Sequence, residues 1–369
     1  MKKIILAALI VIFTAGCVPA NRQTVVSPTV TPGPSATPAL QPTATPQPSP
    51  IPSTAVVLPI AGYRERRTFK VYGQYVQDRF RGYHTGDDIE YADISKDVPV
   101  FAIADGEVVA ARRVNGYGGM LIIRHTVAGR TVSALYGHLD LNSARATGTK
   151  VKAGEQIAIL GDHKSSETDG ERKHLHFHLW DGDGEKLAGY AQTEAALGDY
   201  LNPTDFFLAK GLDVLPPARE IRYGANGTPA PHPTFDGMSF QLPAGWAVEY
   251  VPQIQSLNLF TLTGKGIARA RSNVFIRTFT ADTFLTLDTV TIHQTKDGQI
   301  NGYDLIRYDL EKKPEVPDFP YQPAWRNARH IVTDLRANPG RSVFYVVAQN
   351  PTLPTAVYSD LLGTLRFNQ

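Results

Sequence analysis

The stretch KHLHFHLWDG, residues 173–182, places three histidines on alternate positions. Successive side chains of a β-strand point to opposite faces, so His174, His176 and His178 would share one face and the apolar residues between them the other. Imidazole nitrogens bind metal ions and exchange protons near neutral pH, whereas core packing does not need a row of imidazoles. The histidine face is therefore either a solvated edge or one wall of a site.

A second group of metal-binding residue types lies upstream in YHTGDDIEY, where His84 and Asp88 flank Gly86. Gly86 allows a sharp backbone turn, so the imidazole and the carboxylate could converge although a straight strand would hold them far apart. Histidine and aspartate are apt zinc ligands, and three protein ligands with one open position define a catalytic zinc site. We expect the third ligand to come from the HLH stretch. A purely structural zinc fits less well, because such sites prefer cysteine.

The chain that must position these residues shows short apolar strands separated by turns, and residues 83–181 have no helical period. Two strands are expected around the turn at Asp105, and GGMLIIRHTV and RTVSALYGHLDL should form a hairpin across AGR. TKVKAGEQIAILGD should form another hairpin that turns at Gly154. We therefore predict an all-β antiparallel domain over residues 58–210.

The chain after residue 210 is predicted to form a linker over residues 211–225 and a smaller α+β domain over residues 226–369. Seven short segments alternate as antiparallel strands, and the last segment, TAVYSDLLGTLRF, has apolar residues at helical spacing. The apolar positions of this expected helix are Val357, Leu361, Leu362 and Leu365. His232, His293 and His330 are scattered here, and we expect each to be an ordinary structural residue.

The N-terminal residues 1–17, MKKIILAALIVIFTAGC, have the pattern of an export signal. Two lysines precede an apolar run that is too short to span a bilayer, which takes about 20 residues. TAGC resembles the lipobox of bacterial lipoproteins, with Thr14 where leucine is usual, and this resemblance implies lipidation of Cys17. Cys17 is the single cysteine of the chain, so no internal disulfide can form.

Residues 18–57 are rich in proline, threonine and serine, and we predict a disordered tether because the segment has too little apolar surface to fold. Proline favours extended chain, so the tether could hold a domain up to ~100 Å from a membrane. The 369 residues are enough for two further domains. A net charge of +2 gives no indication of a nucleic-acid partner.

The motifs together resemble one known family. From about Thr68 to Phe207, some 38% of the chain, the sequence is similar to the lysostaphin/LytM-type zinc metallopeptidase domain, a family that cuts peptide cross-links of bacterial cell walls. The matching landmarks are HTGDD, VPVFAIADGEVV, IIRH, LYGHLD, VKAGEQIAILGD, HLHFHL and NPTDFF. One departure is the loop DHKSSETDGERK, which is longer and more charged than in relatives and bears on substrate preference.

The resemblance implies that His84, Asp88 and His176 are the ligands of a Zn²⁺ cofactor, and that His138 and His174 are catalytic residues that do not bind the metal. Zinc lowers the pKa of a bound water to near 7, and a neutral imidazole beside it can accept the proton. A second histidine can hydrogen-bond the oxyanion or protonate the leaving amine. Which of the two histidines has which role stays open.

Four further residues have weaker assignments. His178 stands where relatives often carry an acid, and it would support a ligand from behind or line the cleft. Tyr136 would share a strand face with His138 and either line the cleft or pack in the core. His125 is expected to be structural and His163 solvated.

The leading functional hypothesis is an exported zinc endopeptidase, lipid-anchored to the cell membrane and facing the cell wall, that hydrolyses the peptide cross-links of peptidoglycan. Its partners would be peptidoglycan stem peptides and, through the lipid, the membrane. The alternative is a non-catalytic lipoprotein of the same fold that binds the wall or activates another hydrolase. A third hypothesis assigns the function to the C-terminal domain, in which MSFQLPAGWAVEY, ARSNVFIRTF and LLGTLRF weakly resemble PsbP-like binding modules.

Overall fold

The computed structural model describes residues 55–67, 70–225, 227–280, 287–336 and 343–367. The expected export signal, the lipidation site Cys17 and nearly all of the expected tether lie outside the described residues. Within them, no helix combines the length and the apolar character needed to cross a membrane. The described residues belong to a compact unit, Ile51–Gln369, and the boundaries drawn inside it at residues 210 and 225 stay a prediction.

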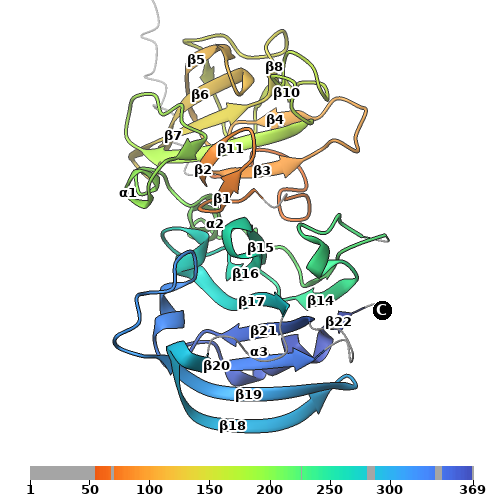
Figure 1. Cartoon of the computed structure of the whole chain (residues 1–369). Helices are drawn as coiled ribbons and strands as arrows, with labels where there is room; N and C mark the ends of the chain where they lie inside the picture. Colours follow the sequence, from red (N-terminus) through yellow and green to blue (C-terminus); the bar gives the residue numbers. More distant parts are fainter. Residues whose placement is uncertain (1–54, 68–69, 226, 281–286, 337–342, 368–369) are drawn as a thin grey trace, which may run out of the picture. The chain divides into compact units, whose positions relative to one another are not determined.

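Three antiparallel sheets are built from the residues before the expected linker (Figure 1). The largest has the order β3(Asp87–Glu90), β11(His174–Asp181), β7(Arg130–Gly137), β6(Gly118–Val127), β5(Gly106–Val114) and β9(Lys150–Val151). The second comprises β1(Tyr75–Gln77), β2(Arg81–His84) and β12(Tyr190–Ala191). The third comprises β4(Pro99–Phe101), β10(Gln156–Leu160) and β8(Leu139–Asp140). Among the described residues of this part, only α1(Glu194–Leu197) and α2(Pro203–Leu208) are helical, which confirms the all-β prediction.

Strand β11 divides its side chains as the alternation predicts. Leu175, Phe177 and Leu179 are fully buried in the main hydrophobic core, and the three histidines point to the other face. The hairpin of β6 and β7 is confirmed by continuous antiparallel pairing from Met120–Gly137 to Val127–Arg130. The core side of the sheet thus fixes which face of β11 is left for chemistry.

The second expected hairpin is wrong. β9 pairs with β5, whereas β10 pairs with β4 and β8. The turn between β9 and β10 bonds instead to the connection between β4 and β5, because Ala153 donates to Asp105 Oδ1 and Gly154 donates to the Ala102 carbonyl. The contact with Asp105, which is distant in sequence, therefore accompanies the observed pairing of β9 and β10 with other strands, and the local turn signal alone does not predict it.

The C-terminal part is also built mainly of strands. A seven-stranded sheet has the order β15(Trp246–Val251), β16(Ser256–Thr261), β17(Ser272–Thr280), β21(Val343–Gln349), β20(His330–Arg336), β19(Tyr303–Lys312) and β18(Val290–Ile300). A smaller sheet comprises β13(Arg219–Arg222), β14(Met238–Leu242) and β22(Arg366–Phe367). The 3₁₀ helices are η1(Pro233–Phe235), η2(Pro252–Ile254), η3(Ala268–Arg271), η4(Leu287–Thr289) and η5(Ala324–Asn327).

The predicted C-terminal helix is confirmed as α3(Thr355–Thr364), the one α-helix among the described residues of this part. Leu361 and Leu362 are buried, together with Tyr358, in a core shared with the large sheet. The apolar spacing therefore predicted both the helix and its buried face.

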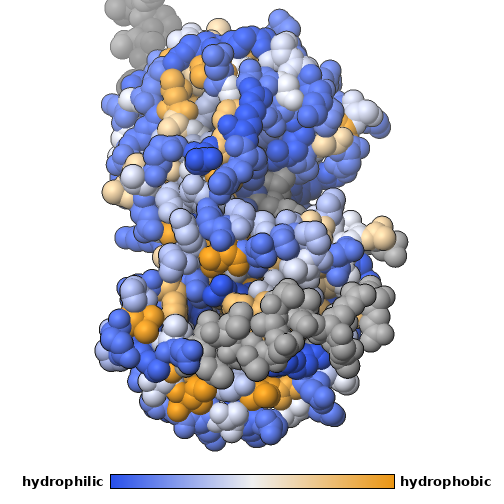
Figure 2. Space-filling view, viewed as in Figure 1, coloured by the Kyte–Doolittle hydropathy of each residue, from blue (hydrophilic) through white to orange (hydrophobic). Residues whose placement is uncertain are grey.

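The described surface is largely hydrophilic on the face shown in Figure 2, where apolar side chains form small separate groups. Large apolar side chains that are exposed are few among the described residues, namely Leu187, Ile292 and Tyr321. No broad apolar patch is visible on this face.

Candidate metal centre

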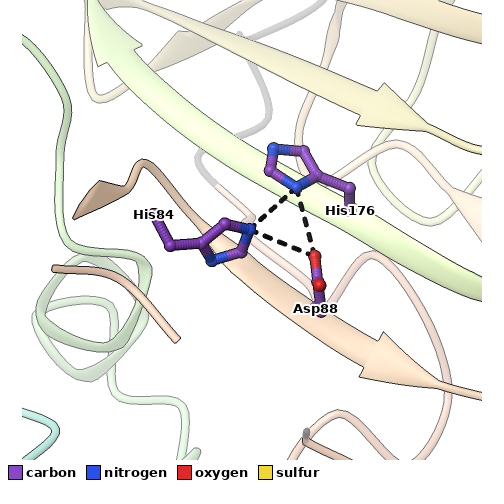
Figure 3. Close-up of side chains that lie close together, drawn as sticks. All are labelled: His84, Asp88 and His176. Carbon is purple, nitrogen blue, oxygen red and sulfur yellow. Dashed lines mark hydrogen bonds and ion pairs between the residues drawn. The ribbon is translucent and has the colours of Figure 1, made fainter. Parts of the chain in front are cut away.

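His84, Asp88 and His176 converge at one buried point (Figure 3). His84 ends β2, Asp88 lies in β3, and His176 lies directly opposite Asp88 on the neighbouring strand β11. His84 Nε2 is 3.1 Å from His176 Nδ1 and 3.3 Å from Asp88 Oδ1, and His176 Nδ1 is 3.1 Å from the same carboxylate oxygen. All three residues are nearly inaccessible to solvent.

Gly86 makes this convergence possible, although for a different reason from the sharp turn expected. Its backbone is not in the left-handed region that favours glycine. The connection between β2 and β3 instead lies against β11, where a Cβ on Gly86 would be 2.1 Å from the Phe177 carbonyl oxygen and 2.6 Å from the His178 Cβ. The absent side chain lets the two ligand-bearing strands approach β11 closely.

The protonation of His176 follows from its hydrogen bonds. His178 Nε2 lies 3.0 Å from the Lys186 carbonyl oxygen, which can only accept, so Nε2 must carry the proton. Because burial lowers the pKa of His178 well below its usual value, the ring is neutral and its Nδ1 is an acceptor. His176 Nε2 therefore donates to His178 Nδ1 across 3.0 Å. The lone pair of His176 is then on Nδ1, which faces His84 and Asp88.

The electrostatics favour a cation at this point. Burial alone would raise the pKa of Asp88, but the adjacent rings of His84, His174 and His176 outweigh it and hold that pKa well below its usual range. Asp88 is thus a carboxylate, and Arg172 donates to its other oxygen, Oδ2, across 3.1 Å. Burial also lowers the pKa of His176, so its ring is neutral and keeps its lone pair.

The donor set fits a zinc ion. With bonds of about 2.0–2.2 Å, a tetrahedral zinc site has ligand atoms about 3.3 Å apart, close to the three separations found here. Two imidazoles and one carboxylate leave one position for solvent or substrate. Among the described residues, this trio is the group whose donor atoms lie close enough to hold a metal.

His138 and His174 adjoin the trio. Their ring centroids are 4.1 Å apart, and both line the same cavity of about 390 Å³ as Asp88 and His176. His174 Nδ1 donates to the Arg172 carbonyl across 2.8 Å, which leaves Nε2 as the unprotonated nitrogen, 3.6 Å from Asp88 Oδ2. His138 Nδ1 is buried and has no hydrogen-bond partner among the described residues.

Both rings are neutral near pH 7. Burial lowers the pKa of His174 to about 4, and burial together with His174 lowers the pKa of His138. Each ring can therefore accept a proton or offer one through hydrogen bonding without carrying a charge beforehand.

Tyr136 is not part of this cavity. Its side chain is fully buried in the core, where its hydroxyl accepts from the Ile103 N–H across 3.2 Å and donates to His125 Nε2 across 2.9 Å. The assumed strand alternation fails because β7 ends at Gly137 and His138 has a left-handed backbone with φ of 65°. His138 is thereby turned away from the face of Tyr136.

The remaining histidines have the ordinary environments that we expected. His125 is buried and donates from Nδ1 to the Ala104 carbonyl, and His163 is exposed in its loop. His232 accepts from the Thr234 N–H at the start of η1, and His293 lies 3.2 Å from Glu311. His330 is buried beside Arg326.

Three cavity residues were not identified from the sequence. Tyr117 is buried with its ring 5.2 Å from that of His176, and its hydroxyl has no partner among the described residues. Tyr190 lies 5.2 Å from His84, and Arg172 contacts Asp88. Arg172 lies two positions before the HLH stretch and could have been noticed there, whereas neither tyrosine lies in a motif with chemical meaning.

Comparisons with known proteins agree with this geometry. Residues 82–188 match the model of peptidase family M23. The residues discussed above all fall within that match, namely His84, Asp88, His138, His174 and His176. Lipoprotein NlpD of Yersinia enterocolitica is 35% identical over 86 residues, which cover 23% of this chain and 79% of that protein. An uncharacterised protein of Haemophilus influenzae is 43% identical over 68 residues, which are 18% of this chain and only 16% of the relative's length.

Among solved structures, the catalytic domain of lysostaphin from Staphylococcus simulans is 24% identical, with a TM-score of 0.29, over 37% of this chain and 89% of that one. The family assignment rests on two findings. They are the match to the family model and the 79% of the NlpD relative that this chain covers. The chain belongs to peptidase family M23, with residues 82–188 as the matching part.

Proposed function

We propose that this protein is a zinc-dependent endopeptidase that hydrolyses peptide cross-links of bacterial peptidoglycan. The observation that supports this most directly is the meeting of His84, Asp88 and His176 at one point, where Asp88 and His176 line the same cavity as His138 and His174. A bound zinc would supply Lewis-acid polarisation of a peptide carbonyl and a lowered pKa for water. In this proposal the three ligands hold the metal and the other two histidines carry out proton transfer.

His174 is suited to accept a proton at Nε2, because its Nδ1 proton is fixed on the Arg172 carbonyl. The His138 ring lies beside it at a tilt of 42°, and its Nδ1, which has no partner among the described residues, could hydrogen-bond an oxyanion or a leaving amine. Arg172 would hold the Asp88 carboxylate in place through Oδ2, which leaves Oδ1 for the metal. Tyr117 and Tyr190 would form the walls of the cavity.

The cellular setting is part of the same proposal. We infer an exported protein of the cell envelope, anchored by a lipid on Cys17, with residues 18–57 as the tether that lets the enzyme reach the wall. The motif around Cys17 and the likeness to a protein named as a lipoprotein support this inference. Growth with labelled palmitate should label the chain, and Cys17→Ala should abolish that labelling.

A non-catalytic role in wall binding or hydrolase activation is the second candidate, because the relative NlpD is named as a lipoprotein and not as a peptidase. The two roles differ in one measurement, the release of new amino groups from defined cross-linked muropeptides by the purified protein. Release that depends on zinc supports the enzyme, and its absence with stoichiometric zinc bound supports the alternative.

Substitutions test the roles separately. His176→Ala should lose bound zinc and activity together, because it removes one of three ligands. His174→Ala should keep zinc, measured by atomic absorption, and lower turnover about 10²–10⁴-fold, the usual contribution of a proton-transferring group. His163→Ala, an exposed histidine outside the cavity, is the matched control and should change neither quantity. Full turnover by His174→Ala would contradict its proposed role.

A further inference from the structure

A second cavity lies in the C-terminal sheet and has an unusual charge. It measures about 90 Å³, and its walls include Arg277 of β17 and Arg326 of η5. Gln322 and Thr289 are further polar walls, and Val290, Leu310 and Phe319 form an apolar side. No acidic side chain lines the cavity among the residues that the structure describes. Within those residues, two arginines thus share a small, partly apolar space without a carboxylate.

Arg326 is only 5% exposed, and its hydrogen bonds are all to neutral groups. Its Nε donates to Gln322 Oε1 across 3.1 Å, and its Nη1 donates to His330 Nε2. His330 in turn donates from Nδ1 to the Ala328 carbonyl, so its Nε2 is free to accept. Arg326 Nη2 has no hydrogen-bond partner among the described residues.

Arg277 is even less satisfied. Its Nε is buried without a hydrogen-bond partner, and within the described chain its guanidinium makes no ion pair. Its described contact is the face of the Phe279 ring, with the guanidinium carbon 4.7 Å from the ring centroid. Asp309, an acid that lies near His330, is paired with the exposed Arg329 through hydrogen bonds of 2.9 and 2.7 Å.

Such an arrangement is costly if nothing binds there. A buried charge normally has a partner of opposite sign, and guanidinium groups stay protonated in proteins. Burial, reinforced by the charge of Arg277, lowers the pKa of Arg326 to about 9, which still leaves it a cation at neutral pH. Burial lowers the pKa of His330 to about 3, so that ring adds no charge. Two like charges therefore face one cavity.

We propose that this cavity binds a small carboxylate that carries a short apolar substituent. A guanidinium group presents paired donors that match the two oxygens of a carboxylate, and here Arg326 Nη2 and the nitrogens of Arg277 are free to bind them. Val290, Leu310 and Phe319 would surround the substituent. A water-sized group needs roughly 10–15 Å³ of such a cavity, so about 90 Å³ has room for the four or five heavy atoms of acetate or propionate.

The same walls disfavour a phosphate ion. A tetrahedral dianion has four oxygens that need donors, whereas the apolar side of the cavity offers none. The expected ligand is therefore a carboxylic acid or the carboxylate end of a small molecule or peptide, presented with a methyl-sized group. This site is independent of the proposed zinc chemistry and would operate even if the protein were not an enzyme.

The test is calorimetric titration of the full chain with acetate, propionate, acetamide and inorganic phosphate at constant ionic strength. We expect saturable, 1:1 binding of acetate and propionate, with propionate tighter, and no binding of the neutral isostere acetamide. Arg277→Gln should weaken propionate binding at least tenfold. Arg329→Gln, which removes the same charge from the exposed pair with Asp309, is the matched control and should leave the affinity unchanged.

Stability gives a second readout that does not depend on the affinity of the probe. In chloride buffer without carboxylate, Arg277→Gln should raise Tm, because it removes one of two facing charges. Added propionate should raise the Tm of the parent protein but not that of the variant. Phosphate binding in preference to propionate would contradict the ligand class. The proposal would be overturned if Arg277→Gln had a lower Tm than the parent and the parent bound no carboxylate. The arginines would then only contribute to packing.

Discussion

His178 stands directly behind a proposed metal ligand, and its contacts give it a specific task. Its Nδ1 accepts a hydrogen bond from His176 Nε2, and its own Nε2 donates a hydrogen bond to the Lys186 carbonyl. The rings of Trp180 and Tyr200 hold it in place, at centroid distances of 5.6 and 5.1 Å. Groups behind a metal ligand commonly fix its tautomer and orientation in this way.

We predict that His178→Leu weakens zinc binding about 10–100-fold, because the buried Nε2 proton of His176 loses its acceptor. His178→Asn should restore most of the affinity, since the asparagine Oδ1 can occupy the place of the imidazole Nδ1. Competition with a fluorescent chelator measures both. Equal zinc affinity in the leucine variant and the parent would show that His176 is oriented without His178.

At the scale of single residues, the family resemblance carried by HTGDD, LYGHLD and HLHFHL indicated the trio His84, Asp88 and His176 and the two neighbouring histidines, which the structure brings close together. It did not indicate Tyr117 or Tyr190, because tyrosines are common and these have no distinctive spacing. The sequence left Tyr136 open between the cleft and the core, and the structure places it in the core. The expected shared face with His138 fails because alternation holds only inside a strand, and His138 has a left-handed backbone.

At the scale of elements, the site depends on how closely the connection from β2 to β3 approaches β11. Gly86→Ala would place a methyl group 2.1 Å from the Phe177 carbonyl oxygen, far inside contact distance. We predict a loss of about 1–3 kcal/mol in the free energy of unfolding, the usual cost of overpacking, and weaker zinc binding because the strands must separate. Urea unfolding and chelator competition measure the two effects.

Gly363→Ala is the control for this substitution. Gly363 lies in α3, where an added Cβ would contact nothing within 4 Å. Alanine is favoured over glycine in a helix, so the control should be neutral or stabilising by up to about 1 kcal/mol and should not affect zinc. Matching losses in the two variants would indicate that the close approach at Gly86 has no special role.

The elements themselves were largely predictable. Alternation fixed the core face of β11 and helical spacing identified α3, because both rest on local periodicity. Pairing was predicted less well. The turn at Gly154 is bound to Asp105 and Ala102, so β9 and β10 join different sheets, and no local pattern carries that information.

At the scale of the whole molecule, one buried carboxyl links the strands β1 and β15. Glu249 is 1% exposed, accepts from the Tyr75 N–H across 2.9 Å and accepts from Asn258 Nδ2 across 3.0 Å. Burial raises the pKa of Glu249, although Arg269 opposes the effect. The folded state therefore holds this proton more tightly than the unfolded chain, and the stability it contributes at low pH is lost as pH rises through the folded pKa.

We predict that Glu249→Gln raises Tm at pH 7 relative to the parent and has a smaller effect at pH 4, where the carboxyl is already protonated. In the parent, Asn258 Oδ1 is buried without a hydrogen-bond partner among the described residues. If the Asn258 amide rotates by 180°, this oxygen can accept a hydrogen bond from the new side-chain amide of Glu249→Gln. Calorimetric scans at the two pH values test this. A larger gain at pH 4 than at pH 7 would contradict the raised pKa.

The contacts around Arg271 have a consequence for how this gene could be recombined. Arg271 donates to the carbonyls of Tyr72 and Leu262, and the Ala268 N–H binds the Gly73 carbonyl, while Gly73 itself donates to the backbone oxygen of His84. A recombination crossover within residues 211–225 would separate the part that matches family M23 from these donors and would expose Val71, which packs with Phe260 and Leu262. The segments before and after residues 211–225 are thus expected to stay together in one gene.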